Sequence, residues 1–298
     1  LKIAEGCNKC CTYCVIPKVR GRFRSVPMEE LVAEAEGLAA QGVQELILVA
    51  QESTLYGVDL YGKKTLPELL HRLGEIRGIQ WIRLQYCYPE EITDELIQAI
   101  KTEPKVCHYL DMPIQHANDR ILKRMGRRTT KAELLARIEK LRQEIPDIVL
   151  RTTLIAGFPG ETEEEFEELC DFVEEARFER LGVFAYSQEE DTPAASMPDQ
   201  IEEEVKLDRR DTLMEIQQEI SLERCQEKIG TVLEAFVEGK IVDENAYVAR
   251  TYMDAPGIDG YVFIHTGEEL MTGHFVRVRV TGALEYDLIG ELEDELTE

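Results

Sequence analysis

Up to about Ser187, short apolar runs alternate with stretches of helical period, and this alternation constrains the fold more than any other feature. Five runs have the length and residue types of buried strands: ELILVA (45–50), WIRLQY (81–86), HYLDMP (108–113), IVLRTTLIAG (148–157) and RLGVFAYS (180–187). Helices are expected between them, for example over 27–41 and 66–77. Together with the opening segment LKIAEG, the pattern predicts an α/β fold with a parallel sheet, a partial (β/α)6 TIM-like barrel that stays open because eight units close a full one.

The chain changes character after this region. Residues 200–228 predict one long helix, with an apolar stripe that includes Ile201, Leu213 and Ile220. From residue 229 onward, short alternating strands are separated by Gly- and Asp-rich turns, which predicts a small five-stranded OB-like β-barrel. We therefore divide the chain into 1–199, 200–228 and 229–298.

The segment AEGCNKCCTYCVIP (4–17) places four cysteines on the first loop of the expected barrel. Ligands of such folds bind where the parallel strands end, and this loop lies at such an end. Cys7, Cys11 and Cys14 have the spacing C-x3-C-x2-C, and Cys10 is an additional thiol. Iron–sulfur clusters are usually held by four thiolates, so three leave one iron of a cubane open for a ligand. The amino and carboxylate groups of S-adenosylmethionine (SAM) can occupy such a position.

Two other interpretations of the cysteines remain open at this point. All four could bind one zinc ion in a non-catalytic binding module, although adjacent Cys10 and Cys11 would strain a tetrahedral site. A thioredoxin-like redox pair is favoured less, because the expected βαβ context is missing. Disulfides are not expected, because we expect a soluble, cytosolic protein whose thiols stay reduced.

Further segments strengthen a resemblance to one family. The cysteine loop, VAQESTLYGVDLYG, YLDMPIQHANDRILKRMGR, RTTLIAGFPGETEEEFEE and GVFAYSQEEDTPAA resemble the radical SAM methylthiotransferases, most closely the members that modify a ribosomal protein. The terminal barrel is similar to the TRAM domain of that family. The resemblance implies a [4Fe–4S] cluster on Cys7, Cys11 and Cys14, with SAM as the second cofactor. The family also carries a second [4Fe–4S] cluster on an N-terminal domain. Since this chain starts at Leu1 inside a strand, we expect it to be a fragment without that domain.

The resemblance also implies SAM contacts. They are Tyr13, Gln51, Glu52, Ser53, Gln115, Arg151, Ile155, Gly157 and Phe158. Structural roles could explain several of these residues: residues 50–53 could cap a helix, and Arg151 could neutralise a buried carboxylate. Gly157 and Gly160 could let a ligand approach the backbone, while Thr162 and Glu165 fit a capping box. His116 is given no catalytic role, since the resemblance assigns the chemistry to the cluster and SAM.

The implied reaction begins with reductive cleavage of SAM and ends with a methylthio group on the β-carbon of an aspartyl residue of small-subunit ribosomal protein twelve. Sulfur insertion would need the second cluster, so we expect this chain to cleave SAM but not to complete methylthiolation. A tRNA adenosine methylthiotransferase of the same family is the alternative.

Charge bears on the partners. The net charge is −25, and residues 229–298 contain four Lys or Arg against fifteen Asp or Glu. Such a surface repels phosphate backbones and favours a basic ribosomal protein over RNA. Two basic runs, at 18–24 and 123–128, interrupt the acidic background of the sequence. Such runs are usually exposed to solvent. In the first, Arg20, Arg22 and Arg24 are expected to dock an acidic reductase such as flavodoxin, or a substrate carboxylate.

Overall fold

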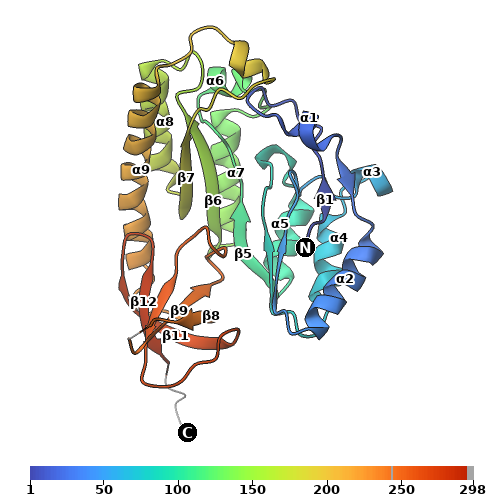
Figure 1. Ribbon diagram of the computed structural model, residues 1–298, viewed down its shortest axis with the longest axis vertical. Coiled ribbons are helices and arrows are strands. Elements are labelled where there is room, and N and C mark those ends of the chain that lie inside the picture. Colours follow the sequence, from blue (N-terminus) through green and yellow to red (C-terminus); the bar gives the residue numbers. More distant parts are fainter. Residues whose placement is uncertain (243, 294–298) are drawn as a thin grey trace. The chain divides into compact units, whose positions relative to one another are not determined.

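Figure 1 shows a computed structural model of the chain, which describes residues 1–242 and 244–293. The chain forms two compact units, Leu1–Ile216 and Gln217–Glu298. In the described residues, no helix combines the length and the apolar composition that crossing a membrane requires. The division at 199 and 228 stays a prediction, since the boundary between the two units falls inside one helix.

A parallel five-stranded sheet forms the centre of the first unit. Its strands follow sequence order: β3 (Glu45–Leu48), β4 (Trp81–Leu84), β5 (Val106–Asp111), β6 (Val149–Ala156) and β7 (Arg180–Ala185). All four residues of β4 are buried, and its one charged side chain, Arg83, is paired with Glu45 Oε1 at 3.0 Å. The five strands predicted between residues 45 and 187 are thereby confirmed.

The opening strand is shorter than predicted. Lys2 forms a single parallel bridge with Val49, and the Ile3 N–H donates to the Val49 carbonyl at 3.0 Å. The chain then turns into β1 (Ala4–Glu5), which pairs antiparallel with β2 (Arg24–Ser25). The opening segment therefore extends the sheet only briefly before it enters the cysteine loop.

Helices connect the strands, and α2, α4, α5 and α7 lie along one side of the sheet (Figure 1). The helices are α1 (Ile16–Arg20), α2 (Met28–Ala40), α3 (Val58–Tyr61), α4 (Leu66–Gly74), α5 (Asp94–Thr102), α6 (Asp119–Arg124), α7 (Lys131–Glu144), α8 (Glu163–Ala176) and α9 (Glu203–Gln226), with 3-10 turns at Pro89–Glu91 and Pro193–Ser196. Thr162 and Glu165 form the expected capping box at the start of α8, because each side chain binds the backbone N–H of the other residue.

The second unit contains the predicted five-stranded barrel. Its strands close in the order β10-β12-β11-β8-β9. They are β8 (Val232–Lys240), β9 (Ala246–Thr251), β10 (Val262–His265), β11 (Phe275–Ala283) and β12 (Leu288–Leu292). The acidic residues at 243, 294, 295 and 298, which contribute to the predicted charge of this region, lie outside the described residues.

The loops that follow β5, β6 and β7 converge at one end of the sheet. Ile121, Phe158 and Tyr186 come from these three loops and belong to one buried apolar cluster. Tyr13, from the cysteine loop, packs against the same cluster. The sheet therefore places the cysteine loop over the carboxyl ends of its strands, as expected for a ligand site.

Backbone contacts hold the cysteine loop in place. The Cys7 N–H donates to the Gly21 carbonyl at 3.1 Å, and the Thr12 N–H donates to the Met125 carbonyl at 2.9 Å. Gly126 has a positive φ of 75°, and a Cβ at this position would lie 2.6 Å from the Cys10 carbonyl oxygen. A side chain at residue 126 would therefore displace the backbone between Cys7 and Cys11.

We predict that Gly126→Ala prevents cluster assembly on the three cysteines. Gly62→Ala is the matched control, because Gly62 also has a positive φ, 72°, but a Cβ there would meet nothing within 4 Å. Both variants should lose about 1 kcal/mol of stability from the left-handed backbone. Only Gly126→Ala should lose iron after anaerobic reconstitution; equal iron content in the two variants would show that the close contact does not matter.

Candidate functional site

Three of the four loop cysteines form a partly enclosed group. Cys7 and Cys11 are buried, with 8% and 7% of their surface exposed, and Cys14 is half-buried. Burial raises the pKa of the Cys7 thiol, and the nearby sulfurs of Cys11 and Cys14 add to this effect. Burial likewise raises the pKa of Cys14, again with a contribution from Cys11. The Cys14 N–H donates to the Cys11 carbonyl at 3.1 Å, and Cys7 and Cys14 line the same cavity, whereas Cys10 is exposed.

Two cavities adjoin this group. One, of about 390 Å³, is lined by residues that include Cys7, Cys14, Gln51, Tyr86 and Tyr88. The other, of about 370 Å³, is lined by Asn8, Lys9, Cys10, Cys11, Tyr88, Glu90, Gly126, Arg127 and Arg128. Within residues 1–242 and 244–293, no three His, Cys, Asp or Glu side chains converge tightly enough to hold a single metal ion.

Among the predicted SAM contacts, Glu52 offers the clearest hydrogen-bond acceptor for a ligand. It is fully buried after β3, and its Oε1 accepts a hydrogen bond from the Thr54 N–H at 2.9 Å. Its Oε2 has no hydrogen-bond partner in the part of the chain that is described. Burial raises the pKa of this carboxyl to about 7. Since an unpaired buried carboxylate oxygen is costly, this atom favours a donor from a bound molecule.

Gln51 and Ser53, the neighbours of Glu52 in the sequence, already form hydrogen bonds within the protein. Gln51 Oε1 accepts a hydrogen bond from the Gly6 N–H at 2.5 Å, although Gln51 also lines the first cavity. Ser53 is fully buried, and its hydroxyl donates to the Gln85 carbonyl at 2.6 Å. Their contacts with SAM stay predictions.

Three of the predicted SAM contacts, Tyr13, Ile155 and Phe158, come together in one apolar cluster. Tyr13 and Ile155 are partly buried against the apolar cluster that contains Phe158. Phe158 itself is fully buried and meets Tyr186 edge to face, with ring centroids 5.4 Å apart. In this arrangement Phe158 supports the cluster from within, while Tyr13 and Ile155 keep some exposed surface.

The two glycines of the turn after β6 make room for the protein's own side chains. A Cβ on Gly157 would lie 2.2 Å from Lys206 Cγ, and one on Gly160 would lie 3.1 Å from Arg124 Nη2. The Gly157 N–H donates to the Glu161 carboxylate at 3.1 Å. In the structure these glycines are thus approached by Lys206 and Arg124, rather than only by a ligand.

Gln115 follows β5, whereas Arg151 is the third residue of β6 and does not lie at the carboxyl end of the strand. Gln115 has a positive φ of 74° and is bonded to β6 through its backbone. Arg151 Nη1 donates to Asp111 Oδ1 at 2.9 Å, and Asp111 is buried. The interpretation of Arg151 as the partner of a buried carboxylate is therefore confirmed.

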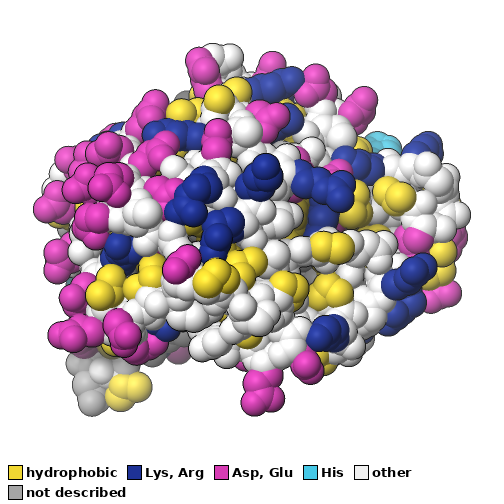
Figure 2. Space-filling model, turned by 90° about the horizontal axis from the view of Figure 1, so that it is seen from above, with side chains coloured by type: hydrophobic (Ala, Val, Ile, Leu, Met, Phe, Trp, Pro, Cys, Tyr) yellow, Lys and Arg dark blue, Asp and Glu magenta, His cyan; other side chains and the backbone are white. Residues whose placement is uncertain are grey.

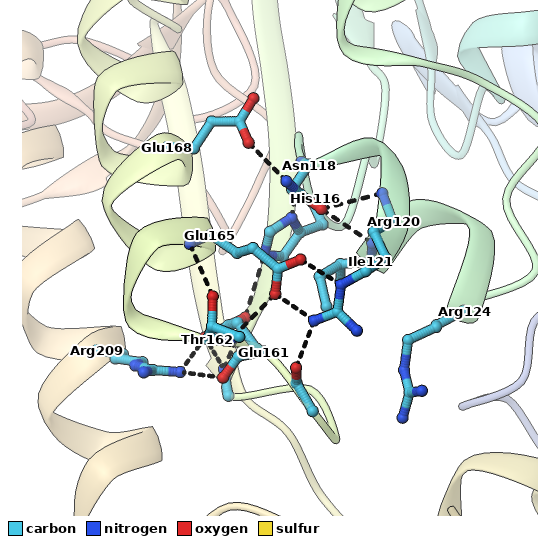
Figure 3. A network of polar contacts seen from close by, with 12 residues as sticks. His116, Asn118, Arg120, Ile121, Arg124, Glu161, Thr162, Glu165, Glu168 and Arg209 are labelled. Atoms are coloured by element: carbon cyan, nitrogen blue, oxygen red, sulfur yellow. Dashed lines mark hydrogen bonds and ion pairs between the residues drawn. The ribbon is translucent and has the colours of Figure 1, made fainter. Parts of the chain in front are cut away.

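His116 is fully buried in a polar network that joins the loops after β5 and β6 (Figure 3). Its Nδ1 accepts a hydrogen bond from the Asn118 N–H at 2.9 Å, so in the neutral ring Nε2 carries the proton and donates to Glu161 Oε2 at 3.1 Å. Glu161 Oε1 is also bound by Arg209 Nη1 at 2.7 Å. These contacts give His116 a structural function between the two loops.

Sequence reasoning missed two residues beside Cys11. The Tyr88 hydroxyl lies 3.1 Å from Cys11 Sγ, and the Arg127 guanidinium lies 4.1 Å from the centroid of the Tyr88 ring. Arg127 belongs to the basic run 123–128, which was expected to be solvated, yet only 5% of it is exposed. No local sequence feature marks either residue: Arg127 follows α6, and Tyr88 follows the buried strand β4.

The remaining basic residues of interest are at the surface. Arg20, Arg22 and Arg24 are exposed, and Arg20 Nη1 lies 3.7 Å from Glu5 Oε1. Figure 2 shows from above the face that carries the loop ends. Lys and Arg side chains gather across its middle, whereas Asp and Glu side chains are concentrated toward the side of α8.

The chain matches two known sequence families. Residues 1–173 match the radical SAM superfamily, and residues 229–292 match the TRAM domain. Solved structures with a related fold include the radical SAM methyltransferase TsrM from Kitasatospora setae, with a TM-score of 0.53, 20% identity, and coverage of 65% of this chain and 35% of that one. Methylornithine synthase (PylB) matches with a TM-score of 0.52 and 13% identity, over 73% of this chain and 61% of that one.

Curated relatives are much closer in sequence. A protein of Lachnoclostridium phytofermentans named ribosomal protein uS12 methylthiotransferase RimO is 66% identical, over 98% of this chain and 67% of that protein. The protein of the same name from Clostridioides difficile is 54% identical, over 99% of this chain and 66% of that protein. The chain thus spans about two thirds of the length of these relatives. With the fold, the cysteine loop and these matches together, the chain belongs to the radical SAM superfamily and, within it, to the methylthiotransferases that carry a TRAM domain.

Proposed function

We propose that this chain binds a [4Fe–4S] cluster and SAM, and that it forms the radical SAM and TRAM part of a methylthiotransferase acting on ribosomal protein uS12. The observation that carries the proposal is the grouping of Cys7, Cys11 and Cys14 at the strand ends, beside the unpaired Oε2 of Glu52. The name of the relatives that are 66% and 54% identical supports the substrate.

Each group in the site has a role in this proposal. Cys7, Cys11 and Cys14 would hold three irons of the cluster and leave the fourth for SAM. When bound and reduced, the cluster would supply one electron for the reductive cleavage of SAM. Glu52 would accept a hydrogen bond from the amino group of SAM, since its Oε2 has no donor among the described residues. Tyr13 and Ile155 would contact the adenine from the surface of their apolar cluster.

The remaining predicted contacts are proposed with supporting roles. Gln51 and Ser53 would shape the amino-acid end of the SAM site through their hydrogen bonds to Gly6 and Gln85. Gln115, Arg151, Gly157 and Phe158 would fix the strand ends beneath it. The substrate atom would be the β-carbon of an aspartyl residue of uS12. Sulfur insertion would use a second [4Fe–4S] cluster.

We predict that the anaerobically reconstituted chain converts SAM to 5′-deoxyadenosine under reducing conditions, and that Cys11→Ala abolishes this activity and the bound iron. Cys10→Ala is the matched control, because Cys10 is exposed and is not one of the three ligands. Iron and sulfide analysis with chromatography of the nucleoside products would measure both effects. A zinc module that uses all four cysteines would instead lose its metal in both variants.

The terminal barrel favours a basic protein over RNA as its partner. Three of its four Lys or Arg residues are paired with carboxylates: Arg250 Nε lies 2.5 Å from Glu238, and Arg277 and Arg279 both lie 2.8 Å from Glu293. Tyr247, a candidate for base stacking, is only 3% exposed, and its hydroxyl accepts from the Leu270 N–H. Binding of RNA usually needs a basic groove with available aromatic rings. We therefore propose docking of uS12, in the cytoplasm, with tRNA as the less favoured substrate.

We predict that the chain binds isolated uS12 more tightly than tRNA at low ionic strength, and that rising salt weakens the uS12 complex, since opposite charges attract across it. Fluorescence anisotropy over a salt series would measure both affinities. Stronger binding of tRNA at every salt concentration would favour the tRNA adenosine alternative.

An acidic reductase such as flavodoxin is the proposed electron donor, docked by Arg20, Arg22 and Arg24. All three are exposed in a segment that directly follows the cysteine loop. Steering by such charges accelerates association.

We predict that Arg20→Glu, Arg22→Glu and Arg24→Glu together slow reduction by flavodoxin about tenfold at low ionic strength. The difference from wild type should shrink with salt. Reduction by dithionite, a small chemical reductant, is the control and should be much less affected. Stopped-flow absorbance of the cluster would measure both rates. Equal rates of reduction by flavodoxin in the wild type and the triple variant would contradict this docking site.

A further inference from the structure

The Tyr88 hydroxyl makes a contact with Cys11 that the proposed function does not assign. Tyr88 lies just before the 3-10 turn Pro89–Glu91, and its oxygen is 3.1 Å from Cys11 Sγ. In the free thiol either atom could donate the proton. Once Cys11 binds iron it is a thiolate without a proton, so the phenol must be the donor.

Two cations lie near the aromatic ring of Tyr88. Lys9 Nζ is 4.8 Å from the ring centroid, and the Arg127 guanidinium is 4.1 Å from it. Arg127 is held in place because Nη2 donates to the Pro113 carbonyl at 3.0 Å and its side chain is only 1% exposed. Cations near the ring withdraw electron density from the phenol, which strengthens the hydroxyl as a hydrogen-bond donor.

Arg127 also contributes fixed charge to the cavity that contains Cys11. Its Nε and Nη1 are buried and make no hydrogen bond within the described residues. Its nearest carboxylate, Glu90 Oε2, is 3.7 Å from Nη2, beyond hydrogen-bond distance. A buried guanidinium with unused donors therefore faces the same part of the loop as the Tyr88 hydroxyl.

We propose that Tyr88, supported by Arg127 and Lys9, is a positioning residue that raises the reduction potential of the cluster by donating a hydrogen bond to Cys11. The proposal rests on the proposed function, since it needs a cluster on Cys7, Cys11 and Cys14. Reduction adds negative charge to the cluster and its thiolates, so a donor to a ligand sulfur stabilises the reduced form more than the oxidised form. Tyr88 thereby makes reduction of the cluster by an electron donor more favourable before SAM is cleaved.

The test is a potentiometric titration of the reconstituted chain, followed by electron paramagnetic resonance of the reduced cluster. Tyr88→Phe should lower the potential. At the solution potential that half-reduces the wild type, the ratio of reduced to oxidised cluster in the variant should fall about tenfold, which corresponds to about 59 mV for a one-electron couple.

Tyr56→Phe is the matched control. Tyr56 is buried and its hydroxyl donates to the Val26 carbonyl at 2.8 Å, so the control loses a buried hydrogen bond that does not involve a loop cysteine. Its potential should equal that of the wild type even if its melting temperature falls. A shift as large as that of Tyr88→Phe would mean that general loosening moves the potential, and would overturn the proposal.

A second substitution keeps the aromatic ring and the hydroxyl. Replacement of Tyr88 by 3-fluorotyrosine makes the phenol a stronger donor, so the potential should rise, opposite in sign to the effect of phenylalanine. Equal potentials in wild type, Tyr88→Phe and the fluorotyrosine protein would overturn the proposal and leave the proposed function intact. Failure of the wild type to assemble a cluster would overturn the proposed function itself.

Discussion

The close contact between Gly126 and the Cys10 carbonyl fixes the course of the cysteine loop, and the arrangement of the site depends on it. With the hydrogen bond from Thr12 to Met125, it ties the loop to the segment after β5. On the other side of the loop, the Cys7 N–H donates a hydrogen bond to the Gly21 carbonyl. Since the thiols lie on so short a loop, their separation is determined mainly by this backbone rather than by long side chains.

The same end of the sheet collects every other group that the proposal uses. Glu52 follows β3, Tyr88 follows β4, and the apolar surface of Tyr13 and Ile155 is built on residues that follow β5, β6 and β7. The network around Glu161 joins two of these loops, with His116 from one and the Gly157 N–H from the other. A polar, charged site thus adjoins an apolar one, which suits a ligand with an amino-acid end and an adenine end.

Local features of this chain were predictable from sequence, and contacts between distant segments were not. Strand positions follow from continuous apolar runs, whereas the assignment of Cys7, Cys11 and Cys14 as ligands rests on spacing within one loop and stays a prediction. Tyr88 was missed because its partner Cys11 is 77 positions away and nothing near Tyr88 indicates the contact. At Gly157 the need for a small residue was recognised, but only the fold reveals that Lys206 approaches it. Arg127 was assigned to the solvent because a basic run is usually exposed, whereas the neighbouring aromatic rings bury it.

The central claim is that Cys7, Cys11 and Cys14 hold a cubane whose fourth iron binds the amino-acid end of SAM. Electron–nuclear double resonance of the reduced cluster, with SAM labelled by ¹⁵N at the amino group and ¹⁷O at the carboxylate, tests this claim most directly. The account predicts strong coupling of both labels to the cluster in the wild type and in Cys10→Ala. A reduced cluster that shows no coupling to either label, or a colourless protein that contains one zinc ion, would contradict it.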